Sequence, residues 1–413
     1  MTPTIVFTSS SDDLQKMLKI HASMPQRGEM KFLKKARESF GFHGGVASVN
    51  GEEWYKMRKQ INEHFLNTES VWTYAKEHYE VSKDFADFIQ NNLNEENEVP
   101  DFRLAMQRWA FEAACVFVLE TRCGTLSGEV TENVKVIIDS TSDILVGFVP
   151  LFFGLPLWKY YPTKDFKAFQ KAISYQMLAL RRHRENLLNE KNANDLPRLA
   201  KALHESPLTA EQQESILADF LGGGIVTTQH AAAFALYCLA NNPEKQEVLR
   251  KEIKEFLKKD NISGKTLQGL KYLHACVRET QRLFPLTLGF SRIIPKDLIL
   301  SGYLVPKDTL VLNVGNIMNN RDERFFKDPD EFLPERWLTS REPSSRFAMS
   351  GSFGQGPRMC PGRRFAMQEL NCLLVVLLDK FHIEYHHKPF ELEFQALFAP
   401  SEDPQFTFIP LEK

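Results

Sequence analysis

A cysteine stands directly before a predicted helix, in the segment Phe353–Gly362, which reads FGQGPRMCPG. The glycines and prolines of this segment favour a tight loop, and Pro361–Gly362 is a typical start for the helix expected over 363–381. Backbone N–H groups and the dipole at a helix N-terminus stabilise a thiolate. Such a thiolate can ligate a metal, and behind a haem iron it donates electron density that favours O–O cleavage. Because single cysteines in turns are commonly structural, this interpretation depends on the rest of the chain.

Two pairs of residues are spaced so that their side chains share one face of a predicted helix. Trp54 and Arg58 stand at i, i+4, where an indole N–H donor and a guanidinium suit an anionic group. Glu279 and Arg282 stand at i, i+3 and can form an ion pair. Each residue taken singly is equally compatible with an ordinary surface position, so the pairs gain meaning only from a larger pattern.

The stretch Gly222–Thr228 reads GGGIVTT and lies inside an apolar run, 215–240, that otherwise predicts a helix. Each glycine in a helix interior costs roughly 1 kcal/mol relative to alanine, and threonine adds little helix propensity. No lysine follows the glycines and no strand precedes them, so a phosphate-binding loop is not indicated. The weakest residues of this helix therefore need another functional reason.

The composition disfavours several classes of protein. The 413 residues are 43% hydrophobic, which is enough for a large core, and the net charge of −2 gives no indication of a nucleic-acid partner. The six cysteines form no CxxC pair, so no zinc or iron–sulfur site is expected, and they are typical of reduced intracellular thiols.

The chain shows no targeting or membrane-spanning signal. Its first residues, MTPTIVFTSSSDDLQKML, have the features of neither a signal peptide nor an arginine-rich transit segment. We expect no stretch to reach the roughly 20 apolar residues that span a bilayer. The nearest is Ile144–Trp158, which is short and interrupted by Pro150 and Pro156.

Helices dominate the predicted secondary structure. They are expected over 10–20, 52–66, 70–93, 103–118, 130–147, 164–192, 209–217, 218–241, 243–258, 266–283 and 363–381. Strands are expected over 298–304, 309–314 and 406–409, and a further strand begins at Val6–Phe7. The predicted fold class is therefore mainly α with small β-sheets, in a single domain over residues 1–413.

The cysteine segment resembles the haem-binding signature FxxGxRxCxG of the cytochrome P-450 superfamily, matched at Phe353, Gly356, Arg358, Cys360 and Gly362. The resemblance implies haem b with the Cys360 thiolate as axial iron ligand, Phe353 against the sulfur and Arg358 on a propionate. Gly354 and Gly362 are expected to contact the cofactor. It also implies the triangular fold of that family, with haem between the long central helix and the helix that follows the cysteine.

Other parts of the chain follow the same family pattern in order. The family places residues like Trp54 and Arg58 on the haem propionates, and Arg292 matches a further propionate arginine. Burying two carboxylates requires such cations. The pair Glu279-x-x-Arg282 resembles the buried ExxR motif of the family, which an arginine of the later meander joins in a structural role. That arginine would be Arg336.

The glycine-rich stretch resembles the signature [AG]GxDTT of the family's central helix. There, the glycines open the helix into a groove for O₂ and water, and a threonine hydroxyl steers protons. Thr227 takes the position of the catalytic threonine, but Val226 occupies the acidic position. Asp219 lies on the same helix face, about 10 Å away by helical rise, and could relay protons through water. The alternative is that Asp219 is a pocket-edge or surface residue.

The resemblance leaves two functional classes open. The first, which we prefer, is a monooxygenase that hydroxylates a lipophilic, sterol- or steroid-like substrate with O₂. The second is a haem-thiolate protein with impaired O₂ activation, which isomerises oxygenated lipids or binds haem and ligand without turnover. Val226 favours the second class, whereas Thr227 and the intact cysteine segment favour the first. The expected pocket is lined by Ile216, Phe220, Gly223, 286–290, Phe398 and part of 33–49.

Several segments resemble the mitochondrial branch of the animal enzymes, notably 120–124 (ETRCG) and 157–164 (LWKYYPTK). The resemblance implies association with the mitochondrial inner membrane and electrons from a small acidic ferredoxin. That partner would dock through Arg278 and, more weakly, through His274, because histidine is mostly neutral near pH 7.5.

Two further expectations concern membranes and the start of the chain. The apolar segment 144–161, with Lys159 and Lys164 beside it, is expected to contact a bilayer surface; the alternative is that it packs the roof of the pocket. The strand at Val6–Phe7 resembles one well inside the family's fold. The leading membrane or targeting segment, the first helix and the first sheet strands are therefore expected to be absent, which would leave an exposed sheet edge.

Overall fold

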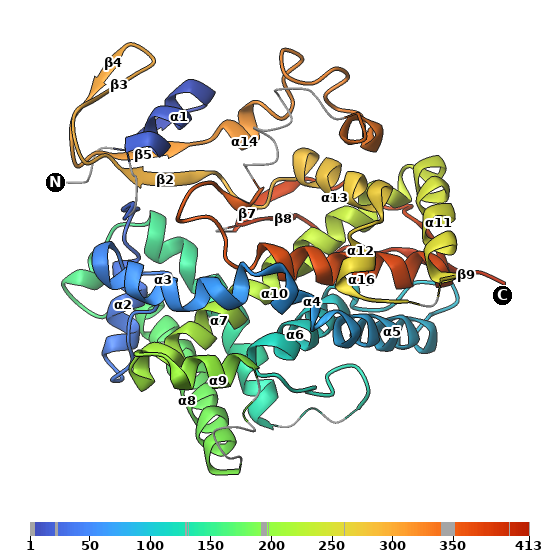
Figure 1. Cartoon of the computed structure of the whole chain (residues 1–413), viewed down its shortest axis with the longest axis horizontal. Helices are drawn as coiled ribbons and strands as arrows, with labels where there is room; N and C mark the ends of the chain where they lie inside the picture. Colours follow the sequence, from blue (N-terminus) through green and yellow to red (C-terminus); the bar gives the residue numbers. More distant parts are fainter. Residues whose placement is uncertain are drawn as a thin grey trace.

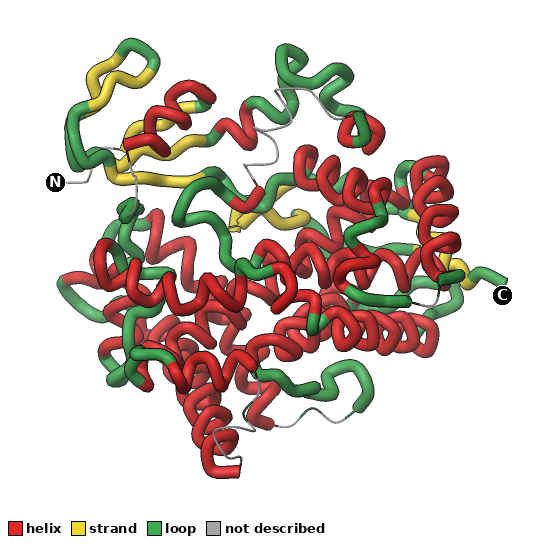
Figure 2. Tube along the Cα trace, viewed as in Figure 1, coloured by secondary structure: helices red, strands yellow, loops and turns green. Residues whose placement is uncertain are grey.

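The computed structural model describes residues 5–20, 24–128, 130, 132–190, 196, 198–259, 261–339, 352–395 and 397–412. Helices fill most of the molecule, and a three-stranded sheet with an adjacent hairpin lies at the upper left of Figures 1 and 2. The predicted fold class, mainly α with small β-sheets, is confirmed.

The helices follow the apolar runs of the sequence. They are α1 (Ser11–Ile20), α2 (Lys31–Glu38), α3 (Gly51–Phe65), α4 (Thr68–Trp72), α5 (Ala75–Asn91), α6 (Phe102–Val118), α7 (Glu132–Phe153), α8 (Lys164–Glu190), α9 (Arg198–Glu205), α10 (Ala210–Ala240), α11 (Pro243–Leu257), α12 (Gly264–Leu267), α13 (Lys271–Leu283), α14 (Gly315–Met318) and α16 (Arg363–Lys380), with 3₁₀ turns η1 (Leu157–Lys159) and η3 (Pro334–Trp337). Of these, α2, α9 and α14 were not predicted, because the short apolar faces of α2 and α9 carry many charges and α14 has only four residues.

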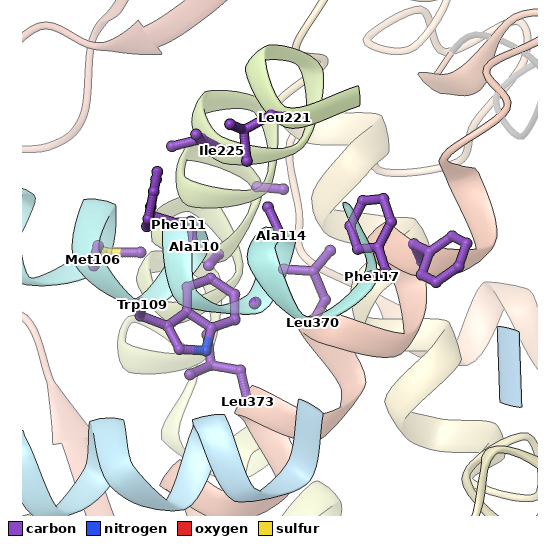
Figure 3. Close-up of a cluster of buried hydrophobic side chains, with 14 of the residues drawn as sticks. Met106, Trp109, Ala110, Phe111, Ala114, Phe117, Leu221, Ile225, Leu370 and Leu373 are labelled. Carbon is purple, nitrogen blue, oxygen red and sulfur yellow. The ribbon is translucent and has the colours of Figure 1, made fainter. Parts of the chain in front are cut away.

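Helix α10 is the axis of the helical part. A capping box between Thr209 and Gln212 begins it, and it continues for 31 residues through the glycines, so the two predicted helices 209–217 and 218–241 are one. It packs against α6, α8, α13 and α16. Figure 3 shows Leu221 and Ile225 of α10 among the buried side chains of α6 and α16. This packing stabilises the helix where its own propensity is weakest.

The strands form four small sheets. The strands are β1 (Ile5–Thr8), β2 (Phe290–Ile293), β3 (Leu298–Leu300), β4 (Tyr303–Val305), β5 (Leu310–Asn313), β6 (Phe381–Glu384), β7 (Leu392–Gln395), β8 (Leu397–Pro400) and β9 (Thr407–Pro410). In the largest sheet, β5 pairs parallel with β1 and antiparallel with β2. Strand β1 lies at its edge, as expected, and Phe7 there is 61% exposed.

Three boundary predictions were wrong for local reasons. The predicted strand 298–304 is a β3–β4 hairpin, because Ser301 and Gly302 adopt positive φ. The predicted helices 70–93 and 266–283 each begin with a short separate helix, α4 and α12.

The expectation that no stretch is long enough to cross a membrane was also wrong. Helix α7 runs through Pro150 to Phe153, and its 22 residues satisfy the length and composition of a membrane span. The sequence prediction ended this helix at 147 because it treated Pro150 as a break. In the structure α7 lies along α8, so the same apolar surface also serves helix packing.

Candidate active site

The cysteine loop, residues 353–362, closes on itself just before α16. Gly354 and Gly356 adopt φ of 70° and 73°, which favours glycine, and the Cys360 amide donates to the Phe353 carbonyl at 2.8 Å. An added Cβ at Gly354 would meet no atom within 4 Å, and one at Gly362 would lie 3.9 Å from the Cys360 sulfur. The loop therefore presents its sulfur at the N-terminus of a helix, as predicted.

Burial and the helix terminus act in opposite directions on this thiol. Burial raises the pKa of Cys360, while the amides of Gly362 and Arg363 and the charge of Arg58 lower it. The net direction is upward, so the expected stabilisation of a thiolate by the helix end is present but smaller than desolvation. A cationic metal on the sulfur would reverse this balance, since a coordinating thiol is deprotonated outright.

Four arginines converge on the cysteine loop, and we call them the arginine cluster: Arg27, Arg58, Arg292 and Arg358. Arg58 Nη2 donates to the Met359 carbonyl at 2.7 Å, and Arg292 Nη2 to that of Gln355 at 3.0 Å. The guanidinium of Arg358 lies 3.9 Å from the centre of the Trp54 ring. The structure thus brings together all three predicted propionate arginines, with Trp54 packed under one of them.

The arginine cluster is short of negative charge. Burial, followed by repulsion from Arg27, Arg292 and Arg58, lowers the pKa of Arg358 to about 8. Burial is also the first cause that lowers the pKa of Arg58 and of Arg292, each to about 10. Arg27 Nε, Arg292 Nε and Arg358 Nη1 are buried and have no partner among the described residues. Unpaired buried cations of this kind fit the two carboxylates of a bound ligand.

Arg27 is the functional candidate that sequence reasoning missed. It stands in a loop, where neither helical spacing nor a local motif marks it, and only the fold carries it to the other three arginines. Burial lowers its pKa, and Asp219 partly opposes this. Its Nη2 donates to the Ala47 carbonyl, which leaves Nε free for a ligand.

The predicted ExxR triad is present: Glu279 and Arg282 are fully buried, and the Arg336 side chain is 13% exposed. Glu279 accepts hydrogen bonds from Arg282 at 2.8 and 3.0 Å and from Arg336 Nε at 2.9 Å. The Leu333 amide and Trp337 Nε1 donate to the same carboxylate at 3.0 and 2.8 Å. One buried carboxylate therefore fastens α13 to the meander that ends at η3.

Helix α10 exposes its glycines to open space. A Cβ at Gly222 or Gly223 would meet nothing within 4 Å, and Gly223 is solvent-exposed. Thr227 Oγ1 donates to the Gly223 carbonyl one turn earlier, which keeps the hydroxyl on this open side. Val226 is partly buried and packs against the core.

The proposed proton relay through Asp219 is contradicted by its contacts, and so is its alternative as a surface residue. Its carboxylate receives Arg37 Nη1 at 2.8 Å and the Ala47 amide at 2.9 Å, with only 7% of the side chain exposed. An added Cβ at Gly45 would lie 2.5 Å from the carboxylate and 2.2 Å from Arg37 Nη1. The acid is thus enclosed in a structural ion pair.

The predicted pocket lining is only partly brought together. Phe398 N donates to the Leu286 carbonyl at 2.8 Å, so two of the predicted segments do meet. In contrast, Ile216 is fully buried and Phe220 stacks on Phe65 at 3.7 Å between ring centres. Both are part of the hydrophobic core, although Ile216 stands seven residues before Gly223 and therefore on the same side of α10.

The predicted docking residues Arg278 and His274 lie beside a cavity of about 350 Å³, which Arg363 and Arg364 also line. Burial, followed by the charge of Arg278, lowers the pKa of His274, so this histidine is neutral near pH 7.5. The cavity borders Phe353, which places this basic surface next to the cysteine loop.

The segment 144–161 divides into exposed and buried residues. Phe153, Leu155 and Tyr160 are 54%, 76% and 84% exposed. Leu151 and Trp158, which were expected to face a bilayer, are buried, and Trp158 stacks on Phe166. The exposed apolar tip is therefore smaller than the sequence suggested.

Sulfur and arginines together point to one kind of ligand. The arginine cluster suits two carboxylates, the cysteine loop presents a sulfur to a metal, and Gly222 and Gly223 of α10 have open space beside them. Haem b supplies the metal and both carboxylates in one molecule, and the donors present here fit it. This is a haem-thiolate protein.

The chain belongs to the cytochrome P450 family, which matches residues 1–408. It is 31% identical to the probable cytochrome P450 12b2, mitochondrial, of Drosophila melanogaster, over 99% of this chain and 80% of that protein. It is 29% identical to cytochrome P450 10 of Lymnaea stagnalis, over 98% of this chain and 76% of that protein. Cytochrome P450 302a1, mitochondrial, of Drosophila melanogaster is also 29% identical, over 90% of this chain and 76% of that protein. The predicted family and haem-thiolate cofactor are thus confirmed, and several relatives bear mitochondrial names.

Proposed function

We propose that this cytochrome P450 monooxygenase hydroxylates a lipophilic, sterol- or steroid-like substrate with electrons from a mitochondrial-type ferredoxin. The observation that carries the oxygenase function is the arginine cluster with unpaired donors beside the cysteine loop, because it suits the haem that family members use. The apolar side chains predicted around the pocket support a lipophilic substrate.

Each side chain of the site has a proposed role. Cys360 is the axial ligand and Phe353 shields its sulfur, while Gly354 and Gly362 allow the cofactor to approach the backbone. The propionates are held by Arg58, Arg292, Arg358 and, in addition to the sequence prediction, Arg27, with Trp54 supporting Arg358. Haem bound here supplies the iron chemistry that activates O₂ for insertion into a C–H bond.

Thr227 is the proposed proton-steering residue. Its hydroxyl is held by the Gly223 carbonyl on the open side of α10, where it can orient a water beside the reacting oxygen. A threonine that donates to the backbone still accepts a hydrogen bond from water, so it can position that water without ionising.

Spectroscopy and substrate binding test this proposal. The reduced protein with CO is expected to show the long-wavelength Soret band of thiolate ligation, and Cys360→Ser is expected to abolish it. Cholesterol and dodecanoic acid then serve as probes in a spectral-shift titration. A normal CO spectrum with a response to dodecanoic acid alone would refute the sterol-like preference, and no thiolate band in the wild type would refute the whole proposal.

We propose that the ferredoxin docks at the basic surface beside the cysteine loop. Arg278, Arg363 and Arg364 line the same cavity, so an acidic protein finds several cations near the sulfur side of the haem site. Arg278→Gln is expected to weaken ferredoxin binding severalfold and more at low than at high salt. His274→Gln, which removes no charge near pH 7.5, is the matched control; equal affinity in wild type and Arg278→Gln would contradict this docking site.

We propose that the tip of segment 144–161 rests on the mitochondrial inner membrane. Exposed Phe153 and Leu155 are flanked by Lys159 and Lys164, an arrangement suited to the interface of anionic lipids. Liposomes containing cardiolipin are expected to float the wild type but not the double variant Phe152→Asp, Phe153→Asp. Because buried Trp158 anchors the segment, the double variant should keep its CO spectrum, and its unchanged flotation would contradict membrane contact.

Val226 keeps a second function open, a haem-thiolate isomerase of oxygenated lipids or a ligand binder without turnover. The specific observation is that the nearest carboxylate on α10, Asp219, is held by Arg37. NADPH consumption with ferredoxin and its reductase separates the two. Product formed from O₂ supports the monooxygenase, whereas activity restricted to lipid hydroperoxides supports the second function.

A further inference from the structure

A small solvent pocket reaches the central helix at Gln229, His230 and Ala233. Its volume is about 60 Å³, and the rest of the lining comes from α6, β8 and the segment after β8. Met106, Gln229 and Ala233 form a buried inner wall, whereas Arg103 and Glu402 at the rim are exposed. Since one water needs roughly 10–15 Å³ of such space, the pocket is large enough for at least two waters.

His230 is one of the residues of α10 that line this pocket. It stands three residues after Thr227 and seven after Gly223, so the three share one stripe of the helix. It is the only titratable side chain of α10 between Asp219 and Tyr237. Side chains at i, i+3 have Cβ atoms about 5–6 Å apart, which one bridging water can span.

Only one of the two ring nitrogens of His230 has a hydrogen-bond partner among the described residues. Its Nδ1 is buried and has no partner among the described residues, while the carbonyl of Phe398 accepts from the other ring nitrogen. In that tautomer Nδ1 is a bare acceptor beside a pocket wide enough for water.

Burial, together with the nearby charge of Arg103, keeps the ring of His230 neutral. Burial, followed by the charge of Arg103, lowers its pKa to about 4, and the Phe398 carbonyl partly opposes this. Asp403 pairs with Arg103 at 2.8 Å, and Glu402 also lies at the rim. A neutral imidazole with one free nitrogen suits brief passage of a proton rather than storage of one.

We propose that this pocket is a solvent inlet and that His230 passes protons from it towards Thr227, in place of the acid missing at position 226. Nδ1 takes a proton from a pocket water, and bulk solvent returns a proton to that water. The ring then releases one proton to the water held by Thr227. The ring ends neutral, so no other reactant is consumed. This inference rests on the proposed function, because only a reaction that reduces O₂ consumes these protons.

The activity test uses haem-loaded protein reduced chemically and mixed with aerated buffer. His230→Gln keeps the size and polarity of the side chain but cannot titrate, and it is expected to slow oxygen consumption at least about tenfold. Its solvent isotope effect in D₂O should rise and its pH profile should flatten. His204→Gln, which makes the same change at an exposed histidine of α9, is the matched control and should stay within about twofold of the wild type.

Histidine C2–hydrogen exchange, read by mass spectrometry, gives a readout that needs no turnover. His78 is buried and lines neither of the two cavities described above, and burial lowers its pKa to about 3, which makes it the internal reference. His230 is expected to exchange several times faster than His78. Ser401→Phe, which covers the exposed rim while leaving His230 in place, is expected to remove that difference and to reproduce the slower oxygen consumption.

The outcomes separate this inference from the proposed function. A wild type without the thiolate CO band overturns the proposed function. A normal band with unchanged rate and isotope effect in His230→Gln, or with His230 exchange as slow as that of His78, overturns the inlet alone. If His230→Gln does not fold, Ser401→Phe decides by the same two measurements.

Discussion

Replacing Arg27 by methionine is expected to weaken haem binding while leaving the haem-free fold intact. In the structure Arg27 donates through Nη2 to the Ala47 carbonyl, and its Nε has no partner. A propionate supplies that partner, so the haem complex loses a charge-assisted bond in the variant. Methionine keeps the packing of the aliphatic stem and removes only the charged head.

The effect of Arg27→Met on haem affinity and its effect on the stability of the haem-free protein differ in size and in sign. A hydrogen bond to a charged group contributes about 1.5–3 kcal/mol, so loss of one propionate contact lowers haem affinity about 10- to 150-fold. In the haem-free protein, Arg27 is the charged residue that lowers the pKa of Arg358 most. Removing the charge of Arg27 therefore reduces the repulsion within the arginine cluster. This relief offsets the lost bond to Ala47, and the free energy of unfolding should fall by less than about 1 kcal/mol, or rise.

Transfer of haem to excess apomyoglobin measures the first effect, and thermal unfolding of haem-free protein by circular dichroism measures the second. The control is Arg250→Met, because Arg250 is also buried but donates to the Leu378 and Phe381 carbonyls. Arg250→Met should lower the free energy of unfolding by about 2–4 kcal/mol and leave the rate of haem transfer unchanged. Haem loss at the wild-type rate in Arg27→Met, or a loss of stability as large as in Arg250→Met, would refute the reasoning.

Three further changes test other parts of the structure. Burial raises the pKa of Glu369 to about 8, so its contribution to stability is present below pH 4.5 and is lost as the pH rises through 8. In urea unfolding, the free energy of unfolding of Glu369→Gln should therefore rise by about 3 kcal/mol relative to that of the wild type between pH 5.5 and 8. A difference that stays constant over this range would contradict the prediction. Glu279→Gln should cost about 3–5 kcal/mol in guanidinium unfolding, because two buried cations lose their carboxylate; a cost under 1 kcal/mol would disprove the role of the triad. Gly222→Ala should raise the melting temperature, whereas Gly289→Ala should lower it, since its Cβ would lie 2.0 Å from the Asn313 carbonyl oxygen; the opposite order would be inconsistent with the open face of α10.

Local patterns predicted the parts of the site that are close together in the chain. The cysteine loop carries its chemistry within ten residues, and Glu279 and Arg282 are one helical turn apart. Arg336 followed from the family pattern, and the structure places its guanidinium on the same carboxylate. For the cysteine loop and the Glu279–Arg282 pair the spacing itself fixes the geometry, whereas Arg336, far along the chain, was placed by the family resemblance.

Contacts that depend on the tertiary fold were not predictable in this way. Arg27 and Arg37 look alike in sequence, as single arginines near the start of the chain, yet one lies in the arginine cluster and the other holds Asp219. Phe220 was expected to line a pocket, but an apolar residue fits a pocket and a core equally well, and only the structure shows that it stacks on Phe65 in the core. Strand β2 was missed because Phe290–Ile293 pairs only through tertiary contact with β5.

The central helix shows how these two kinds of information combine. By sequence, Val226 removes the expected acid and Asp219 looks like its replacement, but the structure holds Asp219 between Arg37 and the Ala47 amide. A carboxylate whose oxygens are already occupied cannot also accept protons from a water chain without breaking a buried ion pair. We therefore propose that competence in O₂ reduction depends less on position 226 than on whether water reaches the Thr227 side of the helix. The small pocket that His230 lines is the proposed route for that water, so the tests of His230 bear directly on the choice between oxygenase and non-turnover binder.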